Sequence, residues 1–185
     1  MDQRQIHELV QKVQNGDETA FAQLYDEFAN RIYAFIRIRV FGDNEGEDIL
    51  QEVFLKAWQG CKNLNIKDLN FSAWLYKIAS NTINDHYRKK YNGTQTVPLE
   101  EASETIAKEN STDSINLELN KKLISENLDH LPSHYKQIIE LRFFQEFSIH
   151  ETAEILNKNS ITVRVWQHRA IKQLEQLFKK YERLT

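Results

Sequence analysis

Apolar residues recur at helical spacing over long stretches of this chain, and little interrupts them. Between residues 17 and 40 they follow one another three or four positions apart, which places them on one face of a helix. They are Phe21, Leu24, Tyr25, Phe28, Ile32, Phe35 and Ile36. The 185 residues include only five Gly and two Pro, and no alternating pattern is long enough to predict a sheet. The predicted fold class is therefore all-α.

Breaks in this pattern divide the chain into two small helical domains joined by a flexible linker. In the first domain, residues 1–92, helices are expected at about 5–14, 17–40, 45–59 and 71–90. In the second domain, residues 118–185, they are expected at about 132–144, 148–156 and 160–181. Residues 93–117 are polar and acidic with few apolar side chains, which is typical of a linker.

The composition argues against several classes of protein. No apolar run is long enough to span a membrane, and the N-terminal residues lack the pattern of a secretory signal. The single cysteine, Cys61, cannot form an internal disulfide and has no neighbours at zinc-ligand spacing. His130 and His134 flank a helix start and could hold a metal, but unpaired surface histidines are the preferred interpretation. We therefore expect a cytoplasmic protein with no membrane insertion, no metal and no cofactor.

Charge is segregated along the chain, although its net value is only −3. Residues 155–174 carry four cations and no acid, whereas residues 40–55 carry five acids and no cation. The stretch 69–92 is again basic, with Lys77, Arg88, Lys89 and Lys90 against Asp85. Two basic patches and one acidic patch imply two kinds of partner.

The second domain has the pattern of a helix-turn-helix. Ser148 and Glu151 form a capping box that opens a short helix, and Asn157 suits a left-handed turn before the next helix. One side of that last helix is apolar, with Val163, Trp166, Ala170, Ile171 and Leu174. The other side carries Arg164, Val165, His168, Arg169 and Lys172. Such a face can enter the major groove, where arginine binds guanine and lysine suits phosphates. A solvated basic face on an ordinary helical hairpin is the alternative.

The predicted helix at 45–59 has an acidic outer face. Its members are Asp48, Gln51, Glu52 and Leu55. A leucine among carboxylates suits docking on a basic protein surface with an apolar centre. A simply solvated acidic face is the other interpretation.

The predicted helix at 71–90 has a polar stripe beside its apolar face. The stripe contains Lys77, Asn81, Asn84 and Arg88, with Lys89 and Lys90 beyond it. Cations attract the phosphate backbone and amides can read base edges. We expect Tyr76 and Tyr87 to be exposed beside the stripe, where each ring could stack on a separated base.

Both domains resemble the sigma factors of bacterial RNA polymerase, of the small extracytoplasmic-function (ECF) kind. The second domain is similar to their region 4 in the motifs LP at 131–132, IIELR at 138–142, FSIHETAEIL at 147–156, TVR at 162–164 and HRA at 168–170. The first is similar to their region 2 in the motifs GD at 16–17, AF at 20–21, LY at 24–25, EDILQEVFLKAW at 47–58 and FSAWLYKIASN at 71–81, with Asp85 and Arg88. Asn157 and Asn159 stand where the family usually has Gly and Ser, and both can still serve as turn and N-cap. Trp166 replaces a residue that is often basic, so one DNA contact of the family is not carried over to this position.

The resemblance implies a factor that directs core polymerase to promoters and is not itself an enzyme. The acidic face would bind the clamp helices of the largest polymerase subunit, and the basic helix at 71–90 would engage the −10 element and help to open it. A pocket for a flipped base is expected around residues 63–70. The helix at 160–181 would bind the −35 element through the residues named above.

Further partners and alternatives stay open. The resemblance implies an anti-sigma factor that clamps the two domains. Glu100, Glu101, Glu104 and Glu109 of the linker either mimic nucleic acid inside the polymerase or belong to a plain tether. A self-sufficient helix-turn-helix regulator, which binds its operator without polymerase, is the alternative function.

Overall fold

The computed structural model describes residues 1–40, 42–65, 70–90 and 128–182, all of its regular elements being helical. The first domain holds α1 (Gln3–Gln14), α2 (Glu18–Arg37), α3 (Asp43–Cys61) and α4 (Phe71–Lys90). The second holds a 3-10 turn, η2 (Leu128–His130), followed by α6 (Ser133–Ile139), η3 (Glu140–Phe144), α7 (Ile149–Leu156) and α8 (Ser160–Glu182). The all-α prediction is confirmed. The predicted linker at 93–117 lies outside the described residues, as does the middle of the predicted base pocket, 66–69.

Side-chain caps begin the helices where the sequence predicts. The Asp17 carboxylate accepts hydrogen bonds from the backbone N–H groups of Thr19 and Ala20 at 2.9 and 3.2 Å, and so starts α2. At α7, the Ser148 hydroxyl accepts from the Glu151 N–H at 3.2 Å, and the Glu151 carboxylate accepts from the Ser148 N–H at 2.8 Å. The predicted capping box is confirmed, and at α2 and α7 a side chain bonds the backbone N–H groups that the first turn leaves free.

The four helices of the first domain pack around aromatic and branched side chains. Phe28, Phe35 and Ile36 of α2 are buried against α3 and α4. The rings of Phe28 and Phe71 lie 5.4 Å apart, and those of Phe21 and Trp58 meet edge to face at 4.9 Å. This packing holds α3 and α4 together as a pair.

The second domain departs from prediction in its first helix. The expected helix at 132–144 is α-helical only to Ile139 and continues as a π-turn, in which the Gln145 N–H donates to the Glu140 carbonyl at 3.0 Å. Helical spacing in the sequence does not predict this π-turn. The turn depends on how Phe143 and Phe144 pack against the core that α8 contributes to. Leu131, Tyr135 and Ala170 form the centre of this domain's own core.

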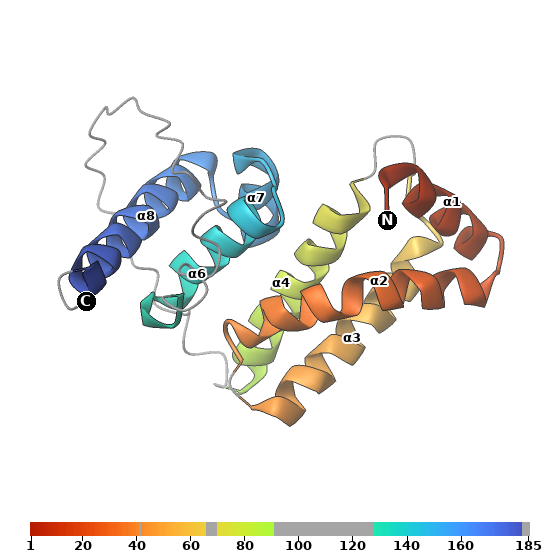
Figure 1. Cartoon of the computed structure of the whole chain (residues 1–185). Helices are drawn as coiled ribbons and strands as arrows, with labels where there is room; N and C mark the ends of the chain where they lie inside the picture. The colour runs from red at the N-terminus through yellow and green to blue at the C-terminus, as the bar shows by residue number, and fades with distance from the viewer. Residues whose placement is uncertain (41, 66–69, 91–127, 183–185) are drawn as a thin grey trace.

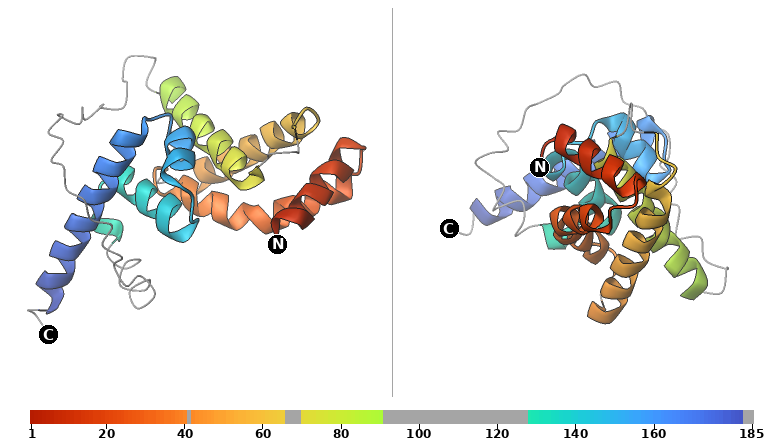
Figure 2. Two further views of the ribbon diagram at one scale, coloured as in Figure 1. Left: turned by 90° about the horizontal axis from the view of Figure 1, so that it is seen from above. Right: turned by 90° about the vertical axis from the view of Figure 1, so that its right-hand side faces the viewer.

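The two domains touch along α4 and α7, which lie side by side in Figures 1 and 2. Phe147, in the turn before α7, is only 4% exposed and belongs to the same apolar cluster as the residues of α2 and α4. The described helices include none that is long and apolar enough to cross a bilayer. The chain therefore forms two helical units with a packed contact between them.

Candidate protein and nucleic-acid interfaces

The predicted acidic face is present on α3. Asp48, Gln51 and Leu55 are exposed, and Leu55 is 57% exposed although it is a large apolar residue. Glu52 is half-buried and pairs with Lys56 at 2.7 Å, and the hydrogen bond from Lys56 lowers the pKa of the Glu52 carboxyl. Carboxylates around an exposed leucine thus face solvent together, with Glu52 held in place by its neighbour.

Tyr25 extends this face beyond the residues that the sequence predicted. The apolar spacing of residues 17–40 places Tyr25 with the core, but it is 39% exposed and its ring lies 4.6 Å from that of Phe54. Its position next to the buried Leu24 at the edge of the apolar stripe was the available signal. Tyr25 is therefore an exposed aromatic side chain that packs on α3 at Phe54.

The second basic face is present on α8. Arg164, His168, Arg169 and Lys172 are exposed, whereas Val165 is half-buried. Asn159 caps the helix, since its side-chain oxygen accepts from the Thr162 N–H at 2.6 Å. The arginines therefore stand on the free side of a helix with a well-defined start.

Asn157 in the turn before α8 and Trp166 within α8 both help to position this helix. Asn157 adopts the predicted left-handed conformation, with φ 52° and ψ 46°. Trp166 is half-buried, its ring lies 4.9 Å from that of His134, and the Lys158 ammonium stands 5.8 Å above it. Trp166 thus packs within its domain and orients a cation. The described residues contain no cluster of metal-ligating side chains around His134 or elsewhere.

Most of the predicted basic stripe of α4 is accessible. Lys77, Arg88 and Lys89 are exposed, and Arg88 pairs with Asp85 at 3.1 Å. Asn84 is half-buried and accepts a hydrogen bond from Arg39 at 2.8 Å. Its amide is therefore less free to read a base than the sequence suggested.

The expectation that Tyr76 and Tyr87 are exposed is wrong. Tyr76 is 0% exposed, packed between Phe35 and Phe147, whose rings lie 5.2 and 5.3 Å away. Burial raises the pKa of its hydroxyl. Tyr87 is half-buried and donates a hydrogen bond to the Arg39 carbonyl. The sequence could not reveal the burial of Tyr76, because part of its cover comes from the second domain.

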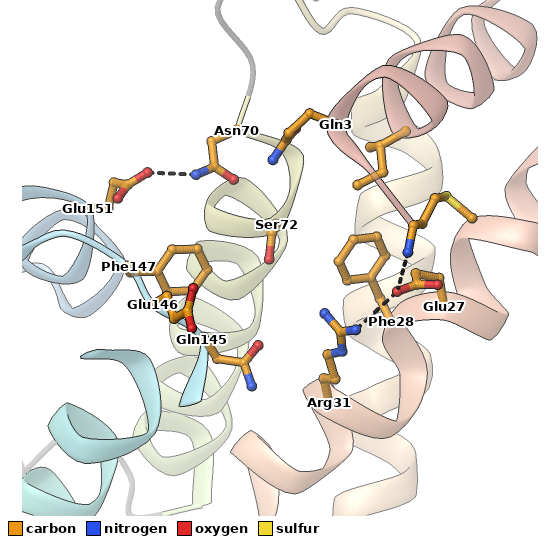
Figure 3. A pocket seen from close by; sticks show the side chains of 12 residues that line it. Gln3, Glu27, Phe28, Arg31, Asn70, Ser72, Gln145, Glu146, Phe147 and Glu151 are labelled. Atoms are coloured by element: carbon orange, nitrogen blue, oxygen red, sulfur yellow. Dashed lines mark hydrogen bonds and ion pairs between the residues drawn. The ribbon is translucent and has the colours of Figure 1, made fainter. Parts of the chain in front are cut away.

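Polar side chains of both domains line a cleft of about 280 Å³ beside this contact (Figure 3). In the first domain, the Glu27 carboxylate forms ion pairs with the Arg31 guanidinium at 3.1 Å and with the N-terminal amine of Met1 at 3.5 Å. Also lining the cleft, Asn70 of the first domain donates from its side-chain amide to the Glu151 carboxylate of the second domain at 2.6 Å. Burial alone would raise the pKa of Glu151, but hydrogen bonds from Ser148 and Asn70 outweigh it and lower the pKa.

Comparison with known proteins agrees with both predicted regions. The family model for sigma-70 region 2 matches residues 24–92, and that for sigma-70 region 4 matches residues 121–174. The ECF RNA polymerase sigma factor SigW of Bacillus subtilis is 32% identical over 177 residues, covering 89% of this chain and 91% of SigW. This chain belongs to the ECF sigma factors. BldN of Streptomyces coelicolor, another ECF sigma factor, is 29% identical over 95% of the chain and 67% of its own length.

Solved structures share the fold of this sigma factor. CnrH, in complex with the cytosolic domain of CnrY, matches with a TM-score of 0.63 and 20% identity over 95% of this chain and 98% of CnrH. RpoE of Bartonella quintana, in complex with the anti-sigma factor NepR, matches with a TM-score of 0.60 and 23% identity over 86% and 96%. At these identities the likeness establishes the helical fold.

Membership of the family decides between the two functions that the sequence left open. The function is that of a sigma factor in transcription initiation, and the self-sufficient regulator is not favoured. The α3, α4 and α8 faces are the candidate surfaces for that function.

Proposed function

We propose that the sigma factor docks on core RNA polymerase through the acidic face of α3 and reads promoters through α4 and α8, with no catalytic step of its own. The observation that carries the proposal is the exposed Leu55 on the same face of α3 as Asp48 and Glu52, on a helix separate from both basic faces. An apolar anchor beside carboxylates suits a basic helical surface such as the clamp helices of the largest subunit. Domain 1–92 would thus serve as region 2 and domain 118–185 as region 4.

In this proposal α8 reads the −35 element as duplex DNA. Arg164, near the N-terminus of the helix, would reach base edges in the major groove, and His168 and Val165 would contact neighbouring positions. Arg169 and Lys172 lie further along the same side and would bind phosphates.

The face of α4 engages the −10 element once its strands separate. Lys77, Arg88 and Lys89 would hold the phosphates of the non-template strand, while Asn81 and Asn84 would contact bases. Tyr76, once Phe147 has moved away from it, and the half-buried Tyr87 would offer surfaces on which bases stack. Such stacking would partly offset the cost of unstacking a base, about a few kcal/mol.

An anti-sigma factor is the further partner that we propose. CnrH and RpoE of Bartonella quintana are both described in complexes, the first with the cytosolic domain of CnrY and the second with the anti-sigma factor NepR. The chain would work in the cytoplasm, where polymerase and promoters are.

Co-elution with bacterial core polymerase on a sizing column tests the docking step. The chain carrying Asp48→Ala, Glu52→Ala and Leu55→Ala should lose the co-elution that the wild type shows. Glu8→Ala with Glu175→Ala is the matched control, because it removes two exposed carboxylates from other helices. If the control loses binding as strongly as the triple variant, α3 is not the docking face. If the wild type does not co-elute, the proposed function fails.

A further inference from the structure

The contact between the two domains covers residues that promoter DNA would need. Phe147 packs edge to face on Tyr76, with ring centroids 5.3 Å apart and planes at 75°. At one end of this contact the Asn70 amide donates to Glu151 at 2.6 Å, and at the other the Asn157 amide donates to Asn81 at 2.8 Å. We call these three pairs the seam.

The seam and the proposed −10 interface share members. Tyr76 and Asn81 are both in the proposed interface, and the seam buries the first and bonds the second. By contrast, Leu55 on α3 and Arg164 on α8 are exposed in the same structure. The second domain therefore covers part of one face, Tyr76 and the Asn81 amide of α4, while Lys77 of the same helix stays exposed.

We propose that the helix-turn-helix domain is the ligand of the α4 face in the free chain, and that it competes there with −10 DNA. This inference rests on the proposed function, because it uses the −10 role of α4. Polymerase can dock on α3 while the seam is closed, whereas engagement of the −10 strand requires the two domains to separate. The free chain is thus held from single-stranded DNA by its own second domain.

The chemistry of the seam suits a contact that must open. The Tyr76 hydroxyl is buried and has no hydrogen-bond partner among the described residues, and such a group disfavours the closed state. The hydrogen bond between Asn157 and Asn81 is exposed, so water can replace either partner, whereas the bond between Asn70 and Glu151 is half-buried. The Tyr76 hydroxyl makes no hydrogen bond in the closed state, but Tyr76 can contact the −10 strand once the second domain leaves α4.

Asn70 offers a substitution that opens the seam without harming α4. Its side-chain oxygen accepts from the Ala73 N–H at 3.1 Å, while its amide nitrogen donates to Glu151. Asn70→Asp keeps the capping oxygen and sets a carboxylate against the Glu151 carboxylate. Asn70→Ser keeps a cap and adds no charge, and is the matched control. Adding Glu151→Gln to Asn70→Asp removes the repulsion and preserves the capping box.

Energy transfer between dyes on Arg4→Cys and Glu175→Cys measures the separation of the domains. Both positions are exposed, whereas the native Cys61 is fully buried and escapes labelling. Asn70→Asp should raise the open-to-closed ratio at least about tenfold, Asn70→Ser should raise it less, and added Glu151→Gln should reverse the effect. Tyr76→Phe should lower the ratio, since it removes the unpaired hydroxyl. Equal energy transfer in the Asn70→Asp chain and the wild type would overturn the proposal that the seam holds the two domains together.

Competition is tested with a fluorescent, random-sequence single-stranded DNA and the free chain. Asn70→Asp should bind it at least about threefold more tightly than wild type, although the new charge itself repels DNA. Lys77→Ala in the Asn70→Asp chain should remove the gain. If the domains separate without any gain in binding, they do not compete for α4. Neither assay contains polymerase, so these outcomes are distinct from failure of the docking step.

A second inference concerns Ile161 in the first turn of α8. It is 56% exposed, and the large apolar residues exposed in the described part of the chain are Met1, Tyr25, Leu55 and Ile161. At about 100° per residue, Ile161 lies at about +60° from Arg164 around the axis of α8, between His168 and Lys172. It therefore stands in the middle of the predicted DNA face, in the first turn of the helix.

We infer that Ile161 contacts a thymine methyl group in the −35 element. The first turn of a recognition helix is the part that reaches base edges, and the thymine methyl is the apolar group of the major groove. Burial against it would offset the cost of exposing a branched side chain. Like the first inference, this one depends on the proposed function, here the −35 role of α8.

Holoenzyme formed with core polymerase first selects its −35 sequence from a randomised library, and this step separately checks the proposed function. Each selected thymine is then replaced by uracil, which lacks only the methyl group. One replacement should weaken wild-type binding about fourfold and should leave Ile161→Ser unaffected. Arg164→Ala should keep the sensitivity to uracil. A selected element without thymine, or an Ile161→Ser chain as sensitive as wild type, overturns the inference.

Discussion

Arg142 in η3 donates from its Nε to the Oε1 of Gln167 in α8 over 2.9 Å. The same guanidinium donates to the Phe147 carbonyl in the turn before α7. One side chain thus joins the π-turn, the turn that carries the seam phenylalanine and the recognition helix, and burial lowers the pKa of its guanidinium. Its removal leaves the Phe147 carbonyl without this donor.

Arg142→Ala should therefore destabilise the chain by about 1–3 kcal/mol, the cost of losing hydrogen bonds to a partly buried group. Gln167→Ala removes one acceptor only and should cost about 0.5–1.5 kcal/mol. Urea denaturation followed by circular dichroism measures both values. Equal costs for the two variants would show that the bond to the Phe147 carbonyl contributes nothing.

The two cations at opposite ends of the α8 face should affect DNA binding differently. Arg164→Ala should cost about 1–3 kcal/mol and relax the preference at one base pair, since arginine reads a base edge. Lys172→Ala should weaken all sequences alike and reduce the salt slope of binding by about 1, because it neutralises one phosphate. Titration of holoenzyme with −35 duplex variants at several salt concentrations separates the two. Loss of sequence preference in Lys172→Ala would contradict the assignment.

Glu140 should make the stability of the chain depend on pH. Burial raises the pKa of its carboxyl above the ordinary 4.5, although a hydrogen bond from Gln145 acts in the opposite direction. Because the pKa of Glu140 is raised in the folded state, its protonated carboxyl contributes to the free energy of unfolding. This contribution is fully present below pH 4.5 and is lost as the pH rises through the raised pKa. Glu140→Gln should therefore gain melting temperature over wild type at neutral pH, and the gain should vanish on acidification. A gain that does not change with pH would contradict this reasoning.

Cys61 should be inert in the folded protein. Its thiol is 0% exposed, and burial raises its pKa to about 11, so little thiolate exists at neutral pH. Reaction with Ellman's reagent should be slow in buffer and fast in denaturant, whereas Arg4→Cys adds a thiol that reacts at once in both. Rapid modification of both thiols in buffer would mean that the end of α3 opens readily.

Local sequence signals predicted those parts of the fold that local chemistry determines. The capping box of Ser148 and Glu151 and the left-handed Asn157 follow from residue types at fixed spacing. The faces of α3 and α8 follow from helical periodicity, so the exposure of Leu55, Arg164 and His168 was predictable. Their roles in binding stay predictions.

The errors lie where residues distant in sequence meet. Tyr76 was assigned to an exposed stripe because periodicity on α4 says nothing about cover from Phe147, more than seventy positions away. Asn84 was assigned to base reading, but Arg39 from the end of α2 occupies its oxygen. The π-turn after Ile139 likewise depends on packing between helices rather than on spacing within one. A pattern within a helix predicts its faces but not what covers them.

The apolar cluster that continues from Leu75 and Tyr76 through Phe147 to Ile155 has a consequence for how the molecule holds together. Two domains that share one stretch of hydrophobic core have affinity for each other without a covalent connection. Residues 1–92 and 118–185, produced as separate polypeptides, would recombine into a non-covalent heterodimer. The connecting segment would then set the local concentration of the two halves, and not whether they recognise each other.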